Sequence, residues 1–493
     1  MYDKAAVLKQ LIEFVGAENV SSDVEDAIPY TRDAYATILR QQVAVPDFVV
    51  MPRTTEEVQK IIKLANEHLV PIYPRSYGAG IAGSALPYKG GIVIDLKRMN
   101  KIIEINDITM TATIESGVTW DRLRLKAREK GLDTIPIGGP YETSPVGNFQ
   151  ITNVTPYSSK YCMDRAVTLE AVLANGEIIR TGSQCTEIGH NLNPYFRYAY
   201  GPDITGLFRG ALGNFGIITK MVIRLRPMAE IETMIIYGFG ELKSALEAMR
   251  KIERLEITRT CQMSNKDVAI RFSMHPEEYK NRAALLKFAA ELPEYTLTIG
   301  LGGNAKLIQI YEEMCLAEVK KQNGSIINIE GERREAWIET CEGASQKVIR
   351  MFEPYGSFGT IVACAPITSV LAMNATIKEI VKQYELKDYI LEAPLEPELL
   401  VIPWDRCSTV YVEHEILYDP LIPEDVGKAA KCLRDCYVAM SSKFGGCHTI
   451  PNRTFLRMMM PSYANLLIGI KKLVDPNGLM LAGGPYSLEP VNT

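Results

Sequence analysis

The sequence predicts an α+β fold with more than one domain, and three observations support this. Residues 46–96 follow the order strand, helix, strand, glycine-rich loop, strand. Residues 169–182 alternate like two strands, and an Asn-Gly pair of the kind found in tight hairpins joins them. Residues 228 to about 450 contain two broad rounds of strand, helix and strand. The length of 493 residues agrees with two or three domains.

The elements follow in order along the chain. Residues 4–16 have the apolar spacing of an amphipathic helix, and residues 46–52 form a short strand between prolines. Thr54 is typical of an N-cap, because two glutamates and helically spaced apolar residues follow it up to about residue 68. Further on, we expect a strand at 110–115, a helix at 119–130 closed by a glycine, and a helix at 463–473.

The composition excludes several classes of protein. The chain is 47% hydrophobic and 23% charged, which is ordinary for a soluble globular protein. A net charge of −5 argues against a general nucleic-acid partner, because such a partner needs a basic face to meet phosphate. No membrane span is apparent, and charges interrupt residues 1–10 where an export signal would be apolar. We therefore expect a cytoplasmic protein.

The cysteines do not indicate a metal site. Ten cysteines are scattered along the chain without a C-x-x-C pair, whereas zinc and iron–sulfur sites need close spacing. Cys432 and Cys436 are four residues apart on an expected helix, a spacing that is more often packing than ligation. We expect free thiols and no bound metal.

The glycine-rich loop resembles a diphosphate-binding cradle. Gly78, Gly80 and Gly83 match G-x-G-x-x-G, and backbone N–H groups can close around an anion where side chains are absent. A dinucleotide-binding turn of the Rossmann type requires a helix directly after the glycines. Here Pro87 and the glycine pair 90–91 interrupt the chain before another strand begins. The loop therefore lies between two strands; the alternative is that it serves only as a turn.

Four motifs in one order resemble the FAD-binding oxidoreductases of the vanillyl-alcohol oxidase and p-cresol methylhydroxylase superfamily. They are the glycine loop, the segment 144–148 with Thr155-Pro156-Tyr157 after it, the hairpin 169–182, and the segment 200–220. There is some similarity to the glycolate and D-lactate dehydrogenase branch as well, at Tyr30-Thr31-Arg32-Asp33. The metal-binding His-rich motif in the cap of that branch is missing here.

The resemblance implies a two-part FAD-binding domain at 1–226, an α+β, ferredoxin-like cap domain at 227–454, and a segment at 455–493 that returns to the FAD domain. The residues that it places around FAD are Arg75, Ser76, Tyr77, Gly78, Ala79, Gly80, Ile81, Ala82, Gly83, Ser84, Ser144, Pro145, Gly147, Asn148, Tyr157, Gly216, Ile217 and Ile218. Covalent members of the family attach flavin through His, Tyr or Cys. The glycine loop has no His, and Tyr355 is out of register, so we expect FAD to be held without a covalent bond.

The resemblance also implies an FAD-dependent oxidoreductase that oxidises an alcohol or a para-substituted phenol by hydride transfer to flavin N5. The phenolate-binding Tyr-Arg pair and final Arg of phenol-oxidising members are absent at 446–454 and 482–486, which puts a phenol in doubt. The alternatives are a 2-hydroxy-acid dehydrogenase of the glycolate or D-lactate type, or an electron-transferring flavoprotein subunit of a larger redox complex. Expected partners are a small-molecule substrate, an electron acceptor (a cytochrome, an iron–sulfur protein or an electron-transfer flavoprotein), and further copies of the chain in a homodimer or larger assembly.

The expected catalytic residues lie in the cap. Glu398 matches an active-site glutamate of the phenol-oxidising members and directly precedes an apolar strand, so it is the first candidate for the base; the alternative is a solvated loop carboxylate. His448 is a second candidate for the base, and Arg453 can anchor a substrate carboxylate or phenolate. Glu413 and Glu415 lie on one face of an expected strand, where an exposed strand face is favoured over a metal site.

Overall fold

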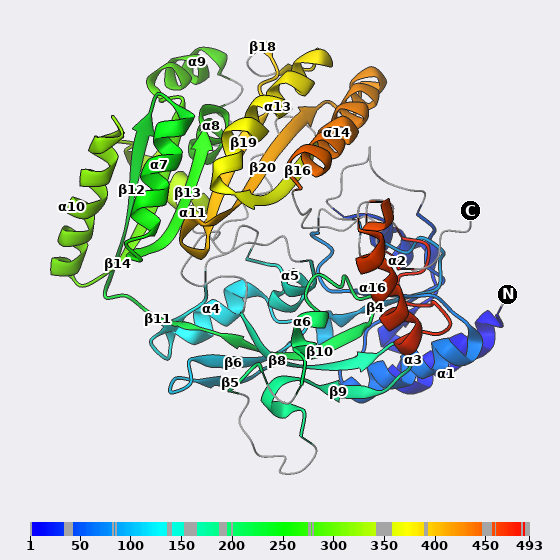
Figure 1. Ribbon diagram of the computed structural model, residues 1–493. Coiled ribbons are helices and arrows are strands. Elements are labelled where there is room, and N and C mark those ends of the chain that lie inside the picture. The colour runs from blue at the N-terminus through cyan, green and yellow to red at the C-terminus, as the bar shows by residue number, and fades with distance from the viewer. Residues whose placement is uncertain are drawn as a thin grey trace.

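A computed structural model of the chain describes residues 2–33, 43–80, 83, 86–135, 141–151, 165–186, 195–198, 201–274, 278, 281–341, 357–388, 393–445, 456–458, 460–484 and 487–488. Figure 1 shows two lobes. The lower lobe combines the N-terminal part of the chain, in blue to green, with the C-terminal part, in red. The upper lobe, which we call the cap, contains the green to orange elements from β12 (Ile231–Phe239) to α14 (Pro423–Phe444).

The first sheet of the lower lobe has the strand order β1-β2-β4-β3. Its strands are β1 (Val20–Ser21), β2 (Phe48–Val50), β3 (Ile72–Arg75) and β4 (Ile92–Asp95). Strands β2, β3 and β4 run parallel, and helices α1 (Lys4–Val15) and α3 (Thr55–His68) cover one face through buried residues such as Leu11 and Ile61. Because the carboxyl ends of parallel strands share one edge, the glycine loop leaves β3 at that edge.

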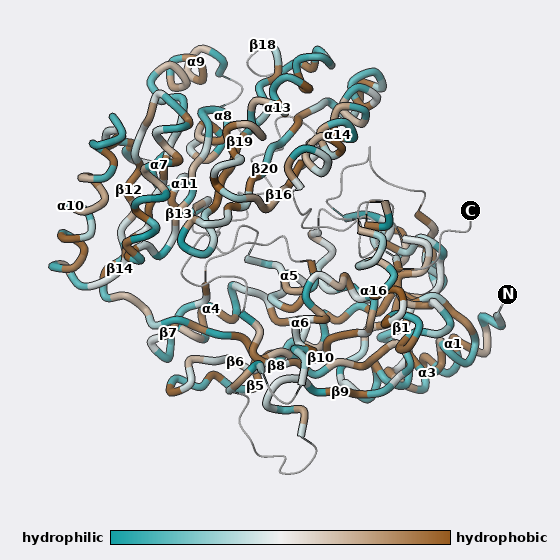
Figure 2. Tube along the Cα trace, viewed as in Figure 1, coloured by the Kyte–Doolittle hydropathy of each residue, from teal (hydrophilic) through white to brown (hydrophobic). Residues whose placement is uncertain are grey.

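The second sheet of the lower lobe is antiparallel, with the order β5-β6-β10-β8-β9. Its strands are β5 (Ile102–Asn106), β6 (Thr111–Glu115), β8 (Ala166–Leu173), β9 (Ile178–Arg180) and β10 (Gly216–Arg224). The predicted Asn-Gly hairpin joins β8 to β9, and Gly176 has a φ of +87°, a conformation that favours glycine. Val172 and Ile217 of the second sheet belong to the core of the first sheet, so the two sheets pack against each other through these side chains. In Figure 2 hydrophobic colour follows β8 and β10.

Helices α4 (Trp120–Arg128), α5 (Pro145–Ile151) and α6 (Ile204–Leu207) pack on the second sheet. The short strands β7 (Leu132–Asp133) and β11 (Arg226–Pro227) pair where the chain leaves this lobe for the cap. Asp133 is buried there and forms ion pairs with Arg124, Arg128 and Arg226. Ion pairs with the buried Asp133 therefore hold the segment that connects the two lobes against the lower lobe.

The cap sheet has the order β15-β12-β14-β13-β19-β20-β16. Its strands are β12 (Ile231–Phe239), β13 (Thr258–Asn265), β14 (Tyr295–Gly303), β15 (Ser325–Ile326), β16 (Ser357–Pro366), β19 (Glu398–Trp404) and β20 (Thr409–Tyr418). One face packs against helices α7 (Leu242–Glu253), α10 (Ala305–Lys321), α13 (Val370–Gln383) and α14 (Pro423–Phe444). Helices α8 (Lys266–Ser273), α9 (Arg282–Glu291) and α11 (Gly331–Cys341) cover part of the other face.

The C-terminal segment returns to the lower lobe. Helix α16 (Pro461–Val474) packs on the second sheet through its apolar side, and Met480 then bridges to Ile72 of β3. The ammonium group of Lys471, which is 3% exposed, donates to the carbonyls of Asn214 and Met480 at 2.7 and 3.0 Å and pairs with Asp475. This buried contact holds the end of the chain beside the segment that precedes β10.

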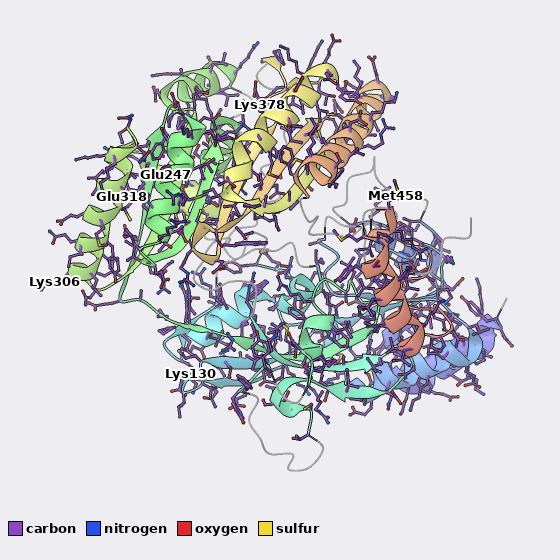
Figure 3. The ribbon with its side chains drawn as sticks, viewed as in Figure 1. Lys130, Glu247, Lys306, Glu318, Lys378 and Met458 are labelled. Atoms are coloured by element: carbon purple, nitrogen blue, oxygen red, sulfur yellow. The ribbon has the colours of Figure 1, made fainter. Side chains whose placement is uncertain are left out.

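The predicted α+β fold is confirmed, as are the expected strands and helices of the lower lobe. Cys432 and Cys436 are both fully buried in the cap core, in agreement with packing. Among the described residues, no helix is long and apolar enough to cross a bilayer. The charged side chains of Lys130 and Lys306 lie at the outer edges of the two lobes (Figure 3). The division of the chain at residues 226 and 454 stays a prediction.

Candidate functional site

Three segments that are distant in sequence meet at the carboxyl end of β3. These are the glycine loop, helix α5, and the segment before β10. A Cβ atom added to Gly147 of α5 would lie 3.1 Å from Ser76 Oγ, and one added to Gly80 would lie 3.3 Å from Ile151 Cδ1. A Cβ added to Gly213 would lie 2.9 Å from Pro74 Cγ. The fold therefore brings together the three segments that were expected to surround the cofactor.

The glycine loop has the backbone expected of an anion cradle. Gly78 has a φ of +67°, and a Cβ there would lie 2.1 Å from Nη2 of Arg75, so no other residue fits without a shift. Within the part of the chain that the structure describes, the backbone N–H groups of residues 76–80 donate no hydrogen bond. Consecutive N–H groups without a protein acceptor are what a bound diphosphate needs.

The turn after β6, at Ser116 and Gly117, connects the cofactor segments. Ser144 Oγ donates to the carbonyl of Ser116 at 2.6 Å, and Ser116 Oγ donates to the carbonyl of Ile218. Gly117 accepts a hydrogen bond from the Tyr77 hydroxyl at 2.8 Å. No sequence signal marked Ser116, because its partners come from other segments.

Ile217 and Ile218 are buried in the two cores of the lower lobe, so only their backbone can approach a cofactor. The close approach of the strands explains the glycine before them. A Cβ on Gly216 would lie 2.4 Å from the carbonyl oxygen of Val172, on the neighbouring strand β8. This part of the site thus consists of backbone.

Two residues that were expected to contact the cofactor form hydrogen bonds to other protein groups. The guanidinium of Arg75 donates to the carbonyls of Tyr30 and Arg32 at 3.0 and 2.8 Å and lies over the Tyr30 ring. Asn148 Oδ1 accepts hydrogen bonds from Trp120 Nε1 at 2.5 Å and from Thr143 at 3.2 Å. Arg75 thus links the end of β3, where the glycine loop begins, to residues 30 and 32. The side-chain oxygen of Asn148 holds α5 against α4.

Several predicted residues lie outside the described residues. They are Ile81, Ala82, Ser84, Tyr157, Tyr355, His448 and Arg453. Their expected roles stay predictions.

The cap contains a buried group of charges that we call the acid cluster: Arg271, Glu398, Tyr411, Glu413 and Glu415. Glu398 is the first residue of β19 and is 1% exposed, and it forms an ion pair with the fully buried Arg271 of α8. Arg271 Nη2 also lies 3.2 Å from Glu415 Oε2. Glu398 is directly opposite Glu415 in the strand pair, and the Tyr411 hydroxyl donates to Glu413 Oε2 at 3.0 Å. The alternative of a solvated loop carboxylate at Glu398 is therefore wrong.

Asn265 connects the two elements that carry this ion pair. Its Oδ1 accepts from the Val268 N–H at the start of α8, at 3.4 Å, and from the Leu399 N–H in β19, at 3.2 Å. Its Nδ2 donates to the carbonyl of Pro397 at 3.3 Å. Asn265 therefore sets where Glu398 stands relative to Arg271, a role that no local sequence pattern indicates.

Burial changes the proton affinity of the cluster. Burial, together with the neighbouring charge of Glu415, raises the pKa of Glu413 to about 8, although the hydrogen bond from Tyr411 and the charge of Arg271 oppose the shift. Burial also raises the pKa of Glu415 to about 7, although Arg271 opposes the shift. The pKa of Tyr411 is raised far above its usual value by burial, so this hydroxyl remains a donor.

The prediction that Glu413 and Glu415 lie on an exposed strand face is wrong. Glu415 is only 8% exposed and Glu413 is partly buried, because α8 overlies this region of the sheet through Arg271. The alternation of side chains is as expected: His414 points to the opposite face, where Asn374 Oδ1 lies 3.2 Å from its Nε2. Among the described residues, no group of three or more His, Cys, Asp or Glu side chains is arranged to hold a metal.

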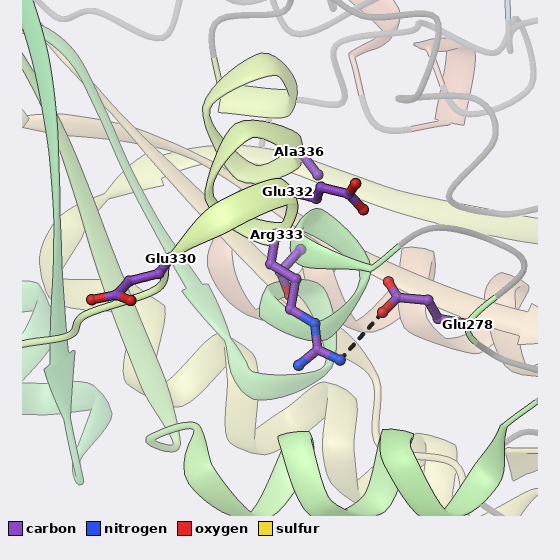
Figure 4. A pocket seen from close by; sticks show the side chains of 6 residues that line it. Glu278, Glu330, Glu332, Arg333 and Ala336 are labelled. Atoms are coloured by element: carbon purple, nitrogen blue, oxygen red, sulfur yellow. Dashed lines mark hydrogen bonds and ion pairs between the residues drawn. The ribbon is translucent and has the colours of Figure 1, made fainter.

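A separate cavity of about 400 Å³ opens between α8 and α11 (Figure 4). It is lined by Ser273, Glu278, Glu330, Glu332, Arg333 and Ala336. Arg333 pairs with Glu278 at 3.2 Å across it. None of the predicted site residues lines this cavity.

Comparison with known proteins identifies the cofactor. Residues 46–182, which contain the glycine loop and α5, match the family of FAD binding domains. The glycolate oxidase subunit GlcD of Bacillus subtilis is 33% identical over 250 residues, which are 50% of each of the two chains. The flavoprotein subunit of 4-cresol dehydrogenase [hydroxylating] from Pseudomonas putida is 25% identical over 95% of this chain and 93% of its own.

The whole fold has a counterpart among solved structures. The crystal structure of p-cresol methylhydroxylase with substrate bound superimposes with a TM-score of 0.83 at 22% identity, over 98% of this chain and 96% of the other. Since residues 46–182 match FAD binding domains, the cofactor is FAD, and the glycine loop lies inside the matched range.

Proposed function

We propose that this chain, an FAD-binding oxidoreductase of the vanillyl-alcohol oxidase and p-cresol methylhydroxylase superfamily, oxidises an alcohol or a para-substituted phenol. The observation that carries the proposal is the position of Glu398, which is buried on the same face of the cap sheet as an apolar and aromatic wall. The wall consists of Val362, Ile402, Trp404 and Tyr411. These buried side chains exclude water from the charge beside them, which suits the oxidation of an aromatic or alkyl substrate.

The residues divide the work in the following way. FAD, when bound, supplies the hydride acceptor at N5. The backbone of residues 76–80 binds the diphosphate, with Ser76 against Gly147 of α5. Glu398 receives the proton that the substrate hydroxyl loses, and Arg271 and Asn265 hold Glu398 in place.

The charges of the cap favour an alcohol or phenol over a 2-hydroxy acid. A hydroxy acid needs a cation for its carboxylate, and the buried guanidinium of Arg271 already serves Glu398 and Glu415. The similarity to GlcD keeps the hydroxy acid as the second candidate, with Arg453 as its anchor. The name of the 4-cresol dehydrogenase relative, a flavoprotein subunit, supports a third candidate in which a partner protein takes the electrons.

Anaerobic bleaching of the purified yellow protein tests these candidates. We expect para-alkylphenols or aromatic alcohols to bleach the flavin without a partner, while glycolate and D-lactate leave it oxidised. Bleaching by the 2-hydroxy acids alone would replace the proposal by the second candidate. A flavin that no member of the panel reduces until an acceptor protein is added would support the third.

Acid precipitation is expected to release the flavin into the supernatant, because no suitably placed His, Tyr or Cys matches the covalent positions of the family. The measurement is the absorbance of the supernatant and of the washed pellet. Yellow colour that stays in the pellet would mean that a residue such as Tyr355 forms a covalent bond.

A further inference from the structure

We propose that Glu413 and Glu415 form a proton-holding pair that takes over the substrate's proton from Glu398, with Arg271 and Tyr411 as positioning residues. The proposal rests on the proposed function, because it needs a substrate hydroxyl beside Glu398. It assigns a role to two carboxylates that the local sequence pattern placed on an exposed strand.

The charge balance of the acid cluster requires a bound proton. Three carboxylates, those of Glu398, Glu413 and Glu415, share one guanidinium on a face that is largely closed to water. One positive charge can neutralise one carboxylate, and burying further unpaired charge is costly. Protonation of one or more of the acids relieves this cost.

The geometry indicates which acids hold the proton. Glu398 is the direct partner of Arg271, while Arg271 lies 3.2 Å from Glu415 and forms no ion pair with Glu413 among the contacts described. Among the described residues, Tyr411 alone donates a hydrogen bond to Glu413, which lies two residues from Glu415 on the same strand face. The excess proton therefore belongs to the pair Glu413 and Glu415 rather than to Glu398.

Other ionisable groups around the pair come from each neighbouring element. Arg271 and, one turn earlier, Asp267 come from α8; Glu398 comes from β19; Cys364 of β16 stands opposite Tyr411. Burial raises the pKa of Asp267 to about 6, although Arg271 opposes the shift. Among the described residues that face the pair, Arg271 is thus the cation, and the surroundings favour the protonated form.

The proposed step is balanced. FAD, when bound, would accept the hydrogen of the substrate C–H bond together with both of its electrons. The substrate O–H bond breaks, and a new O–H bond forms on Glu398. The pair of Glu413 and Glu415, of which Glu415 lies directly across the strand pair, then takes this proton, so that Glu398 is again the carboxylate partner of Arg271. The product is the aldehyde, ketone or quinone methide.

Thermal unfolding against pH tests the proton-holding part without any turnover. The pKa values of the pair are raised in the folded chain, whereas in the unfolded chain both carboxyls have the ordinary glutamate pKa of about 4.5. Above that pH the folded state therefore holds protons that the unfolded chain has released. Stability is thus lost as pH rises from about 5 to about 8. The double variant Glu413→Gln/Glu415→Gln should lack this loss. Its unfolding midpoint should exceed that of wild type by a margin that grows with pH.

Glu396→Gln is the matched control. Glu396 is two residues before Glu398 but largely exposed, and it pairs with Lys378 at 2.7 Å at the outer side of the cap (Figure 3). Its stability curve should run parallel to that of wild type. Parallel curves for the double variant as well would overturn the proposal.

Two single variants should move the pH dependence of flavin reduction in opposite directions. Glu415→Gln removes the like charge that raises the pKa of Glu413, and Tyr411→Phe removes the hydrogen bond that lowers it. In stopped-flow experiments, the rate of flavin reduction should rise with pH in each protein. The pH at which it rises should be about one unit lower than in wild type for Glu415→Gln and about one unit higher for Tyr411→Phe. A shift of the same sign in both variants, or no shift in either, would overturn the proposal.

If no alcohol or phenol reduces the wild-type flavin, the proposed function fails, and the unfolding curves still decide whether the pair holds a proton.

Discussion

Glu398→Gln is expected to slow flavin reduction by a factor on the order of 10² to 10⁴, the usual cost of losing a general base. The substitution keeps the shape of the side chain and removes the charge that faces Arg271. Stopped-flow bleaching with a turned-over substrate measures the effect. A rate within about threefold of wild type, too small a change for a lost base, would show that Glu398 serves only as an ion-pair partner.

A structural effect must be separated from this chemical one. Arg271 keeps Glu415 as a partner in the variant, so the fold should survive, although an imperfectly paired buried charge destabilises it. Circular dichroism and the flavin content report whether the protein is folded and loaded. Glu396→Gln is the control here too, because its exposed carboxylate should change stability by no more than about 0.5 kcal/mol.

Gly80→Val is expected to abolish most FAD binding. A Cβ at this position would already lie 3.3 Å from Ile151 Cδ1, so the branched side chain of valine must displace either α5 or the loop backbone that forms the cradle. The measurement is the flavin-to-protein ratio after purification, with circular dichroism as the check on folding. Gly240→Val is the control, because a Cβ at Gly240 meets no atom within 4 Å. Normal flavin content in Gly80→Val would remove the loop from its assigned role.

Gly80 is not among the glycines with positive φ, so its small size matters for space and not for backbone conformation. Gly78 and Gly83 are the loop glycines that adopt positive φ. The motif spacing could not distinguish these two reasons, because both select the same residue.

Local patterns in the sequence were sufficient to predict the helices and strands of the lower lobe. Helix α3 begins at its predicted cap Thr54, and the Asn-Gly hairpin forms as expected, because both depend on residues a few positions apart. The segment order also indicated a glycine loop between parallel strands, since a helix must cross between β2 and β3. The glycine loop could be indicated for the same reason: its glycines act through their own backbone.

Only the tertiary structure shows which charged residues of the cap lie together. Arg271 had no sequence signal, because it meets Glu398 and Glu415 only when α8 lies over the sheet. The alternation at Glu413 and Glu415 correctly gave one face, but an alternating strand does not reveal whether that face meets water or another element. The sequence by itself therefore determined the elements and the cofactor loop, which depend on short-range backbone geometry, while burial and ion pairing, which depend on distant segments, were decided by the packing of the cap.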